Sequence, residues 1–243
     1  MKMAGGPKQF GIDAEQLPAV LASADMRAVA FEGFHIFAGS QNLRSDAIQE
    51  AQSKSLDLAI ELARHAPAPV RVLNLGGGFG IPYFPREQAL DLEAVGAGMR
   101  SIAERAASAL PGTQLVIELG RYLVGEAGLY VCRVVDRKVS RGHVFLVTDG
   151  GLHHHLAASG NFGQVVRKNY PVVVANRVRG VERENASVVG PLCTPLDLLA
   201  SSMELARADV GDLIAVFHSG AYGLSASPLG FLSHPRPAEA LVG

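Results

Sequence analysis

The sequence predicts an α/β domain followed by an all-β domain, and two observations lead to this prediction. In the first half of the chain, strand-like runs alternate with long segments that carry apolar residues at helical spacing. In the second half, short runs rich in β-branched residues are separated by Gly, Asn and Asp. Because the composition changes near residue 125, we expect one domain over residues 1–126 and a mostly antiparallel β domain over residues 127–243.

The first half has the pattern βαβαβ, which is typical of a parallel sheet with helices packed against it. In the first helical segment Ile48, Leu56 and Leu62 share one face, and we expect that face to be buried. The strand-like runs are 28–38, 71–75 and 114–119, and the helical segments are 45–66 and 87–109.

The second half contains five strand-like runs with little helical periodicity between them. Turn-forming residues separate these runs at short intervals, as expected for antiparallel strands. The runs are 129–136, 143–149, 170–178, 184–190 and 212–218.

The composition narrows the class of protein. The 243 residues are 48% hydrophobic and 19% charged, enough for a substantial core, and the net charge of −1 gives no electrostatic footprint for nucleic acid or an anionic membrane. No apolar run approaches the roughly 18 residues that cross a bilayer, and the first ten residues lack the apolar core of a secretory signal. Cys132 and Cys193 are too few for a disulfide framework and lack metal-ligand spacing. We therefore expect a small-molecule partner and a cytoplasmic location.

Three consecutive glycines, Gly76 to Gly78, follow the second strand-like run in "VLNLGGGFGIPYF". At the carboxyl end of a parallel strand, successive N–H groups of such a run can converge on an anion, so a phosphate is the first candidate. The spacing does not complete G-x-G-x-x-G, and no lysine and hydroxyl residue follow as in a nucleotide-triphosphate loop. A tight turn without a ligand is the structural alternative.

Polar side chains also follow the other two predicted strands. Ser40 comes after the first, and Glu118 and Arg121 come at the end of the third. An arginine suits a phosphate, whereas a glutamate in the same site needs a cationic partner or a protonated ring nitrogen. A structural salt bridge between Glu118 and Arg121 is the alternative.

Six stretches resemble, in order and approximate spacing, the fold type III pyridoxal-phosphate-dependent decarboxylases, the diaminopimelate and ornithine decarboxylase family. The similarity covers nearly the whole chain and is closest to the exosortase-associated, diaminopimelate-decarboxylase-like branch. It implies that residues 1–126 are the C-terminal part of a (β/α)8, alanine racemase-like barrel that binds the cofactor. The stretches are "KQFGI", "FHIFAGSQ", "NLGGGFGIPY", "ELGRYLVGEAG", "GPLCTPLD" and "GAYGLSASPLGFLSHPRPAEALV".

The resemblance implies a cofactor, pyridoxal 5′-phosphate, and a role for each site residue. Glu118 would contact the pyridine nitrogen and keep it protonated, so that the ring accepts electrons when carbon dioxide leaves. Cys193 would reach the reacting carbon from the opposite subunit of a homodimer and handle a proton there. The residues that would surround the cofactor phosphate are Ser40, Gly76, Gly77, Gly78, Arg121 and Tyr222.

The chain departs from the family pattern at two positions. Phe37 stands where relatives carry a histidine stacked on the ring; it can stack but cannot hydrogen-bond, and we expect His35 to point away from the ring. Thr194 stands where many relatives carry an acid that meets a distal ammonium, and Asp197 nearby is either a substitute for it or structural. The substrate is therefore not specified by the resemblance.

Three further features are weaker candidates. Arg167 and Tyr170 lie roughly where relatives hold a substrate carboxylate, but with different local spacing. The run His153 to His155 invites a metal-binding interpretation, yet adjacent side chains point in different directions, so we expect no metal site.

The family's Schiff-base lysine lies early in the barrel, ahead of the region that this chain resembles. No lysine of this chain matches it; those considered are Lys8, Lys54, Lys138 and Lys168. We therefore expect a fragment of a longer decarboxylase that lacks the N-terminal part and is inactive alone. The alternative is a catalytically inactive homologue that acts as a binding or regulatory protein, and a racemase with a similar barrel is a weaker third interpretation.

Overall fold

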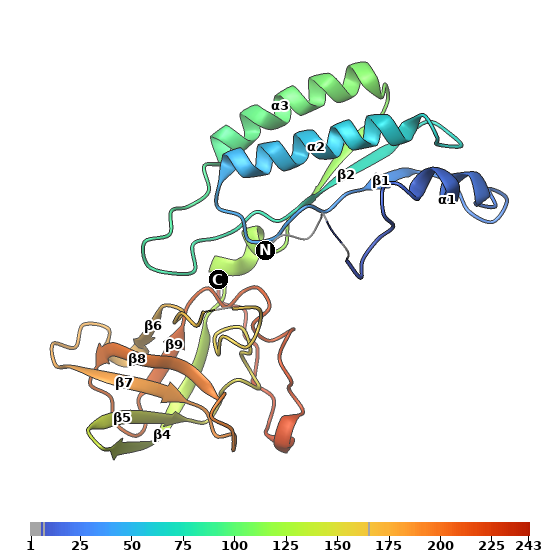
Figure 1. Cartoon of the computed structure of the whole chain (residues 1–243). Coiled ribbons are helices and arrows are strands. Elements are labelled where there is room, and N and C mark those ends of the chain that lie inside the picture. Colours follow the sequence, from blue (N-terminus) through green and yellow to red (C-terminus); the bar gives the residue numbers. More distant parts are fainter. Residues whose placement is uncertain (1–5, 7, 165) are drawn as a thin grey trace. The chain divides into compact units, whose positions relative to one another are not determined.

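The computed structural model describes residues 6, 8–164 and 166–243 (Figure 1). Backbone contacts divide the chain into two compact units, residues 1–82 with 88–122 and residues 83–87 with 123–243. The first unit contains the parallel strands with their helices, and the second contains the β domain. The division into a cofactor-binding domain, residues 1–126, and a β domain, residues 127–243, stays a prediction. The short segment 83–87 belongs structurally to the second unit.

The first unit contains a parallel sheet of three strands in the order β1-β2-β3. Helices α2 and α3 cover one face of this sheet (Figure 1). The predicted βαβαβ arrangement is therefore confirmed. Its elements are α1 (Leu17–Ser23), β1 (Gly33–His35), α2 (Ser45–Ala63), β2 (Val72–Gly77), α3 (Leu92–Ala109) and β3 (Gln114–Glu118), and α4 (Arg121–Val124) follows.

The core of the first unit lies between the sheet and the two long helices. Phe34 and Leu73 from the strands pack in one buried cluster with Leu56 from α2. The helix face that we predicted from Ile48, Leu56 and Leu62 is buried, as expected. Because strand side chains alternate between the two faces, the residues between these core positions point away from the helices.

Helix α3 begins later than the predicted segment 87–109. The Asp91 side chain accepts a hydrogen bond from the Ala94 N–H at 3.0 Å and caps the helix at that point. Residues 88–90 precede the cap, and residue 87 belongs to the second unit.

The second unit contains one sheet of six strands in the order β6-β9-β4-β5-β7-β8. Every strand pair is antiparallel except β5 with β7, which is parallel. The predicted β domain is thus confirmed, with a strand, β8, that we did not predict. Its elements are η1 (Gly125–Ala127), β4 (Tyr130–Ser140), β5 (His143–Thr148), β6 (Val172–Val174), η2 (Ala175–Arg177), β7 (Arg183–Val189), β8 (Leu198–Ala206), β9 (Leu213–Val216) and η3 (Phe231–Ser233).

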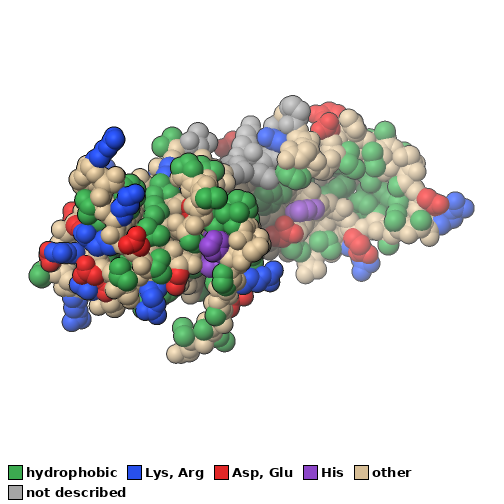
Figure 2. Space-filling view, turned by 90° about the horizontal axis from the view of Figure 1, so that it is seen from below, with side chains coloured by type: hydrophobic (Ala, Val, Ile, Leu, Met, Phe, Trp, Pro, Cys, Tyr) green, Lys and Arg blue, Asp and Glu red, His purple; other side chains and the backbone are tan. Residues whose placement is uncertain are grey.

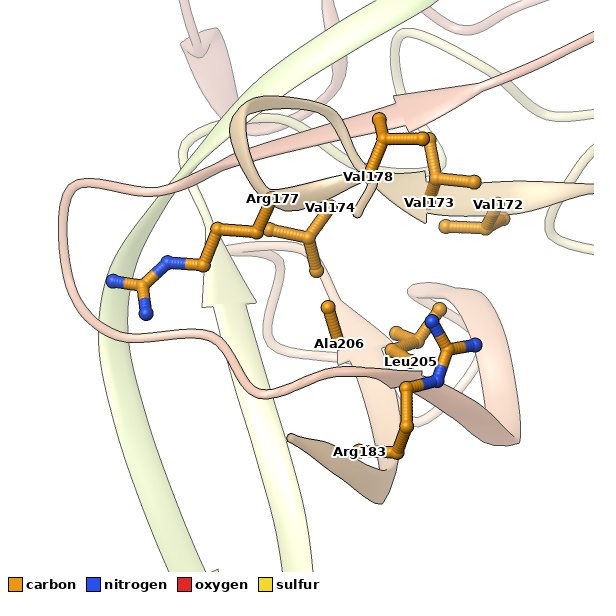
Figure 3. Close-up of a pocket in the computed structure, with 8 residues that line it drawn as sticks. All are labelled: Val172, Val173, Val174, Arg177, Val178, Arg183, Leu205 and Ala206. Carbon is orange, nitrogen blue, oxygen red and sulfur yellow. The ribbon is translucent and has the colours of Figure 1, made fainter. Parts of the chain in front are cut away.

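The sheet curls until β6 and β8, the first and last strands in its order, line the same small cavity (Figure 3). The cavity measures about 30 Å³, room for only one or two water molecules. Its two arginines already have carboxylate partners: Arg177 Nε lies 2.9 Å from Asp212, and Arg183 Nε lies 3.4 Å from Glu204. The cavity marks the near-closure of the sheet and is too small for an organic ligand.

Candidate cofactor site

The glycine run shapes the carboxyl end of β2. A Cβ atom on Gly77 would lie only 1.6 Å from the carbonyl oxygen of Glu118, so only glycine allows β2 and β3 to approach this closely. Gly76 and Gly78 have positive φ angles, +69° and +83°, which favour glycine. The run therefore has a structural function in addition to any role in ligand binding.

The loops that follow β1 and β2 are tied to each other. The Asn42 N–H donates to the Gly78 carbonyl at 2.9 Å, and the Gly80 N–H donates to the Asn42 carbonyl at 2.9 Å. A Cβ on Gly76 would lie 2.7 Å from Cδ2 of Phe37, so the Phe37 ring lies directly against the glycine turn. The loop that carries Phe37 and Ser40 and the glycine loop thus form one edge of the sheet, as predicted.

The Glu118 carboxylate has two partners, one on each of the other two strands of the sheet. His35 Nε2 lies 3.1 Å from Glu118 Oε2, and the Asn74 amide nitrogen donates to Glu118 Oε1 at 2.9 Å. The side chains of His35 and Glu118 are 54% and 50% exposed, so the carboxylate remains accessible. His35 pairs in register with Asn74 and reaches Glu118, so it lies among the predicted site residues, and its direction relative to a cofactor ring stays a prediction.

Asn74 was not predicted as a site residue. Its Oδ1 accepts the Gly76 N–H at 2.9 Å, which closes a local turn within the strand end. An asparagine two residues before a glycine is the sequence signal for such a turn, and it was present in "NLGGG". Because the Gly76 N–H is used in this turn, Gly76 contributes backbone conformation, and Gly77 and Gly78 are the better candidates for phosphate donors.

In the second unit, the loop with Cys193 and Thr194 is held by Asp197. The buried Asp197 carboxylate accepts the backbone N–H of Leu152 at 2.6 Å and that of Leu192 at 2.8 Å. This resolves the two interpretations of Asp197 in favour of a structural role. The Cys193 thiol is exposed, and Thr194 Oγ1 accepts the Leu196 N–H at 3.3 Å within the same loop.

Tyr222 has a backbone conformation that is rare for a residue other than glycine, with φ +59°. Its side chain is 42% exposed, and its ring centroid lies 5.9 Å from that of Phe162. Seven other described residues besides the glycines also have a positive φ, and the role of Tyr222 at the cofactor stays a prediction.

Arg167 and Tyr170 make internal contacts. The Arg167 guanidinium donates to the carbonyl oxygens of Ser159 and, at 2.7 Å, Leu198, and burial lowers the pKa of Arg167. Tyr170 is 5% exposed, and its ring centroid lies 4.8 Å from that of Tyr83. Their roles at a substrate carboxylate remain predictions, and the contacts found here stabilise the second unit.

Each of the three adjacent histidines lies in a different environment. His154 Nε2 lies 2.8 Å from the Pro235 carbonyl, and His155 Nε2 lies 2.9 Å from Ser219 Oγ. His153 is fully buried, with its ring centroid 3.9 Å from that of His154. Burial is the main cause that lowers the pKa of both His153 and His155 to about 4. Among the residues that the structure describes, no three side chains are arranged to hold a metal ion.

Two further observations concern the charges on the surface and the character of the helices. On the face shown in Figure 2, lysine and arginine side chains are interspersed with acidic ones. In the described ranges, no helix combines the length and the apolar character that spanning a bilayer requires.

The residues at the strand edge fit pyridoxal phosphate. A half-exposed carboxylate, with each oxygen already held by one donor, has further acceptor capacity for a ring N–H. Phe37 offers an aromatic ring beside the glycine turn, and Arg121 begins α4 three residues after Glu118, the last residue of β3. The donor set thus provides an acid for the ring and, nearby in the chain, a guanidinium for a phosphate.

The fold and the site define a class of two-domain protein. A parallel β/α unit carries an acid and a glycine turn at the ends of its strands, and a curled β domain follows it in the chain. A family model described as pyridoxal-dependent decarboxylase, C-terminal sheet domain, matches residues 21–220. The chain belongs to this family, which confirms the resemblance and the predicted cofactor.

Individual relatives agree with this assignment. The L-glutamyl-[BtrI acyl-carrier protein] decarboxylase of Niallia circulans is 42% identical over 99% of this chain and 57% of that protein. The 2-[(L-alanin-3-ylcarbamoyl)methyl]-2-hydroxybutanedioate decarboxylase of Staphylococcus aureus is 28% identical over 98% of this chain and 60% of that protein. A crystal structure of diaminopimelate decarboxylase from M. jannaschii with L-lysine superposes with a TM-score of 0.71 at 26% identity, over 84% of this chain and 45% of that one. The chain thus spans about half the length of these relatives.

Proposed function

We propose that the chain forms the ring-binding and phosphate-binding part of a pyridoxal-phosphate-dependent amino-acid decarboxylase. The observation that carries this proposal is the position of Glu118, which lies accessible at the strand edge beside the glycine turn and is held by two donors. We further propose that the enzyme is a cytoplasmic homodimer.

Each predicted contact has a chemical role in this proposal. Bound pyridoxal phosphate supplies an electron sink for the pair left behind when carbon dioxide departs. Glu118 holds a proton at the ring nitrogen, and Phe37 packs on the ring. The residues that bind the phosphate are Ser40, Gly77, Gly78, Arg121 and Tyr222, with the turn at Gly76 setting the loop conformation.

Cys193 is the proposed proton donor to the substrate carbon. Its thiol is exposed in a loop that Asp197 holds in place, so it is presented on a fixed backbone. In the proposed homodimer this loop serves the site of the opposite subunit. A general acid positioned in this way contributes typically 10²- to 10⁴-fold to a rate.

The substrate class follows from Thr194. A threonine in place of an acid provides no charge to pair with a distal ammonium, and an unpaired ammonium in a site is costly. The relative in Niallia circulans acts on an L-glutamyl group attached to an acyl-carrier protein. We therefore propose a substrate whose distal end is uncharged, zwitterionic or carboxylate-bearing, such as a glutamyl group.

The test is a panel of substrates given to the protein expressed from the complete gene, with carbon dioxide release as the readout. The panel contains free glutamate, a glutamyl thioester, diaminopimelate, lysine and ornithine. Release from a glutamyl or diaminopimelate substrate in excess of lysine and ornithine supports the proposal. Ornithine as the best substrate would overturn the substrate class, and no release from any amino acid would favour the inactive-homologue alternative.

A further inference from the structure

The hydrogen bonds around Glu118 form a continuous series across all three strands of the first unit. The Gly76 N–H donates to Asn74 Oδ1, Asn74 Nδ2 donates to Glu118 Oε1, and His35 Nε2 lies 3.1 Å from Glu118 Oε2. We propose that Asn74 and His35 are positioning residues that fix the orientation of the Glu118 carboxylate. This inference rests on the proposed function, because it concerns how Glu118 meets the cofactor ring.

The Gly76 N–H determines the direction of the series. A backbone N–H can only donate, so the atom of Asn74 that faces Gly76 must be the oxygen. The other end of the amide, the NH₂ group, then faces Glu118. Oε1 of Glu118 must accept this bond, and the turn at Gly76 therefore determines which atom of Asn74 holds the Glu118 side chain.

His35 acts on the second carboxylate oxygen. With Glu118 ionised, Nε2 of His35 carries the proton and donates to Oε2. Each oxygen is thus held by one donor, from β1 and from β2, while Glu118 itself ends β3. A carboxylate held by donors from two other strands rotates less than one held by a single partner, and it presents its remaining lone pairs in one direction.

Strand register brings these residues together. His35 pairs directly with Asn74, and Gly77, three residues further along β2, pairs with Glu118. The register shift between Asn74 and Gly77 coincides with the turn that Asn74 closes. The turn and the position of Glu118 therefore depend on the same side chain.

The decisive comparison is between Asn74→Asp and Asn74→Ala in the protein from the complete gene. Aspartate keeps the oxygen that accepts the Gly76 N–H, but it removes the donor to Glu118 and places a second negative charge beside it. If Asn74 positions Glu118, Asn74→Asp lowers kcat by about tenfold or more, at least as much as Asn74→Ala, with bound cofactor retained. If Asn74→Asp behaves like wild type while Asn74→Ala is impaired, Asn74 only shapes the turn and the proposal is overturned.

His35 is tested by rescue. His35→Gln retains a side-chain N–H donor, whereas His35→Phe keeps an aromatic ring without one. We expect His35→Phe to lower kcat with little change in substrate KM and His35→Gln to recover part of it. Equal kcat values for His35→Phe and wild type would remove His35 from the proposal.

The β domain offers a matched control. Asn176 has the same arrangement: Oδ1 accepts the Leu213 N–H at 2.9 Å and Nδ2 donates to Asp212 at 2.7 Å. Asn176→Asp makes the same chemical change at a structural carboxylate, so it should lower the midpoint of thermal unfolding and leave kcat per folded, cofactor-loaded protein unchanged. An equal loss of kcat in Asn176→Asp and Asn74→Asp would show a general effect of the substitution and would count against the proposal.

A readout without cofactor separates this proposal from the proposed function. In the purified chain, NMR of the Asn74 side-chain amide should show an upfield shift of its protons in Glu118→Ala. Protection of the Gly76 amide against hydrogen exchange should survive in Asn74→Asp and be lost in Asn74→Ala. These results would support the hydrogen-bond series even if no decarboxylation were found, whereas an unshifted Asn74 amide would contradict it in either case.

Discussion

Alanine differs from glycine by one methyl group, and the backbone of β3 leaves no room for that group at position 77. The Cβ would meet the Glu118 carbonyl oxygen at 1.6 Å. We expect Gly77→Ala to lower the free energy of unfolding by about 3 kcal/mol or more, through separation of β2 and β3. Urea unfolding followed by circular dichroism measures this change. Gly96→Ala is the control: its Cβ would have open space on α3, and it should raise stability by up to about 1 kcal/mol. The same unfolding midpoint for both variants would contradict the close approach.

The exchange of Glu118 for glutamine keeps the shape of the side chain and removes its charge. We expect Glu118→Gln to lower kcat by orders of magnitude in the protein from the complete gene, because glutamine cannot hold a proton at the ring nitrogen. Bound cofactor, measured by absorbance, should stay near the wild-type level because the phosphate contacts are unchanged. Near-normal turnover would remove Glu118 from the ring nitrogen.

Arg121 should affect cofactor retention more than chemistry. Arg121→Ala removes the proposed charge-assisted contact to the phosphate, typically worth about 1.5 to 3 kcal/mol, or about 10- to 150-fold in the dissociation constant. Equilibrium dialysis against pyridoxal phosphate measures the change, and Arg100→Ala, a surface substitution on α3, serves as control. A dissociation constant that matches wild type would place Arg121 away from the phosphate.

Residue types at the strand ends allowed the sequence to indicate the glycine turn and Glu118, which the structure brings together, whereas the place of Arg121 at this site stays a prediction. They did not indicate Asn74 and His35, because only the register of three strands brings those side chains to the carboxylate. Residue type suggests possible chemistry, whereas partner choice depends on pairing that is not local in sequence.

The segment after β5 that contains the three histidines should make the folded protein less stable at acid pH. Burial lowers the folded-state pKa of His155 to about 4, below the ordinary value of 6.5, so folding favours the neutral ring. The contribution of His155 to the free energy of unfolding is therefore fully present above pH 6.5. It is lost as the pH falls toward 4, by up to about 3 kcal/mol.

Urea unfolding from pH 7 to pH 4 measures this dependence. His155→Gln should show a shallower loss of stability than wild type. Ser219→Ala removes the partner of His155 Nε2 but keeps the titrating ring, so it should be less stable and still retain the pH dependence. Parallel pH profiles for wild type and His155→Gln would contradict the role of His155.

Helix α2, helix α3 and the parallel strands could be predicted because their apolar spacing matches the faces that the core buries. Strand β8 could not, because its sequence, LLASSMELA, contains residues that favour helices. Pairing with β7 overrides this preference, and the positive φ of Ser202, +45°, lies close to an irregularity in that pairing.

For the whole chain, we predict that no single lysine becomes covalently linked to pyridoxal phosphate. Lys54 is paired with Glu50 at 2.6 Å on α2, and the Lys168 ammonium lies 5.0 Å from the Phe84 ring centroid. Neither lies on a strand of the parallel sheet. Incubation of the purified chain with the cofactor, borohydride reduction and mass spectrometry should show sparse labelling spread over several lysines. Stoichiometric labelling of one lysine together with carbon dioxide release would contradict this prediction.

The assignment of residues 83–87 to the second unit affects how the gene can be recombined with those of relatives. Tyr83 and Phe84 lie before α3 in the chain, yet their rings contact Tyr170 of the β domain. A crossover after residue 122 would pair one parent's Tyr170 with another parent's Tyr83. Chimeras that exchange residues 83–87 together with 123–243 keep these aromatic contacts within one parental sequence, and they should be recovered as folded protein more often than chimeras made with a single crossover.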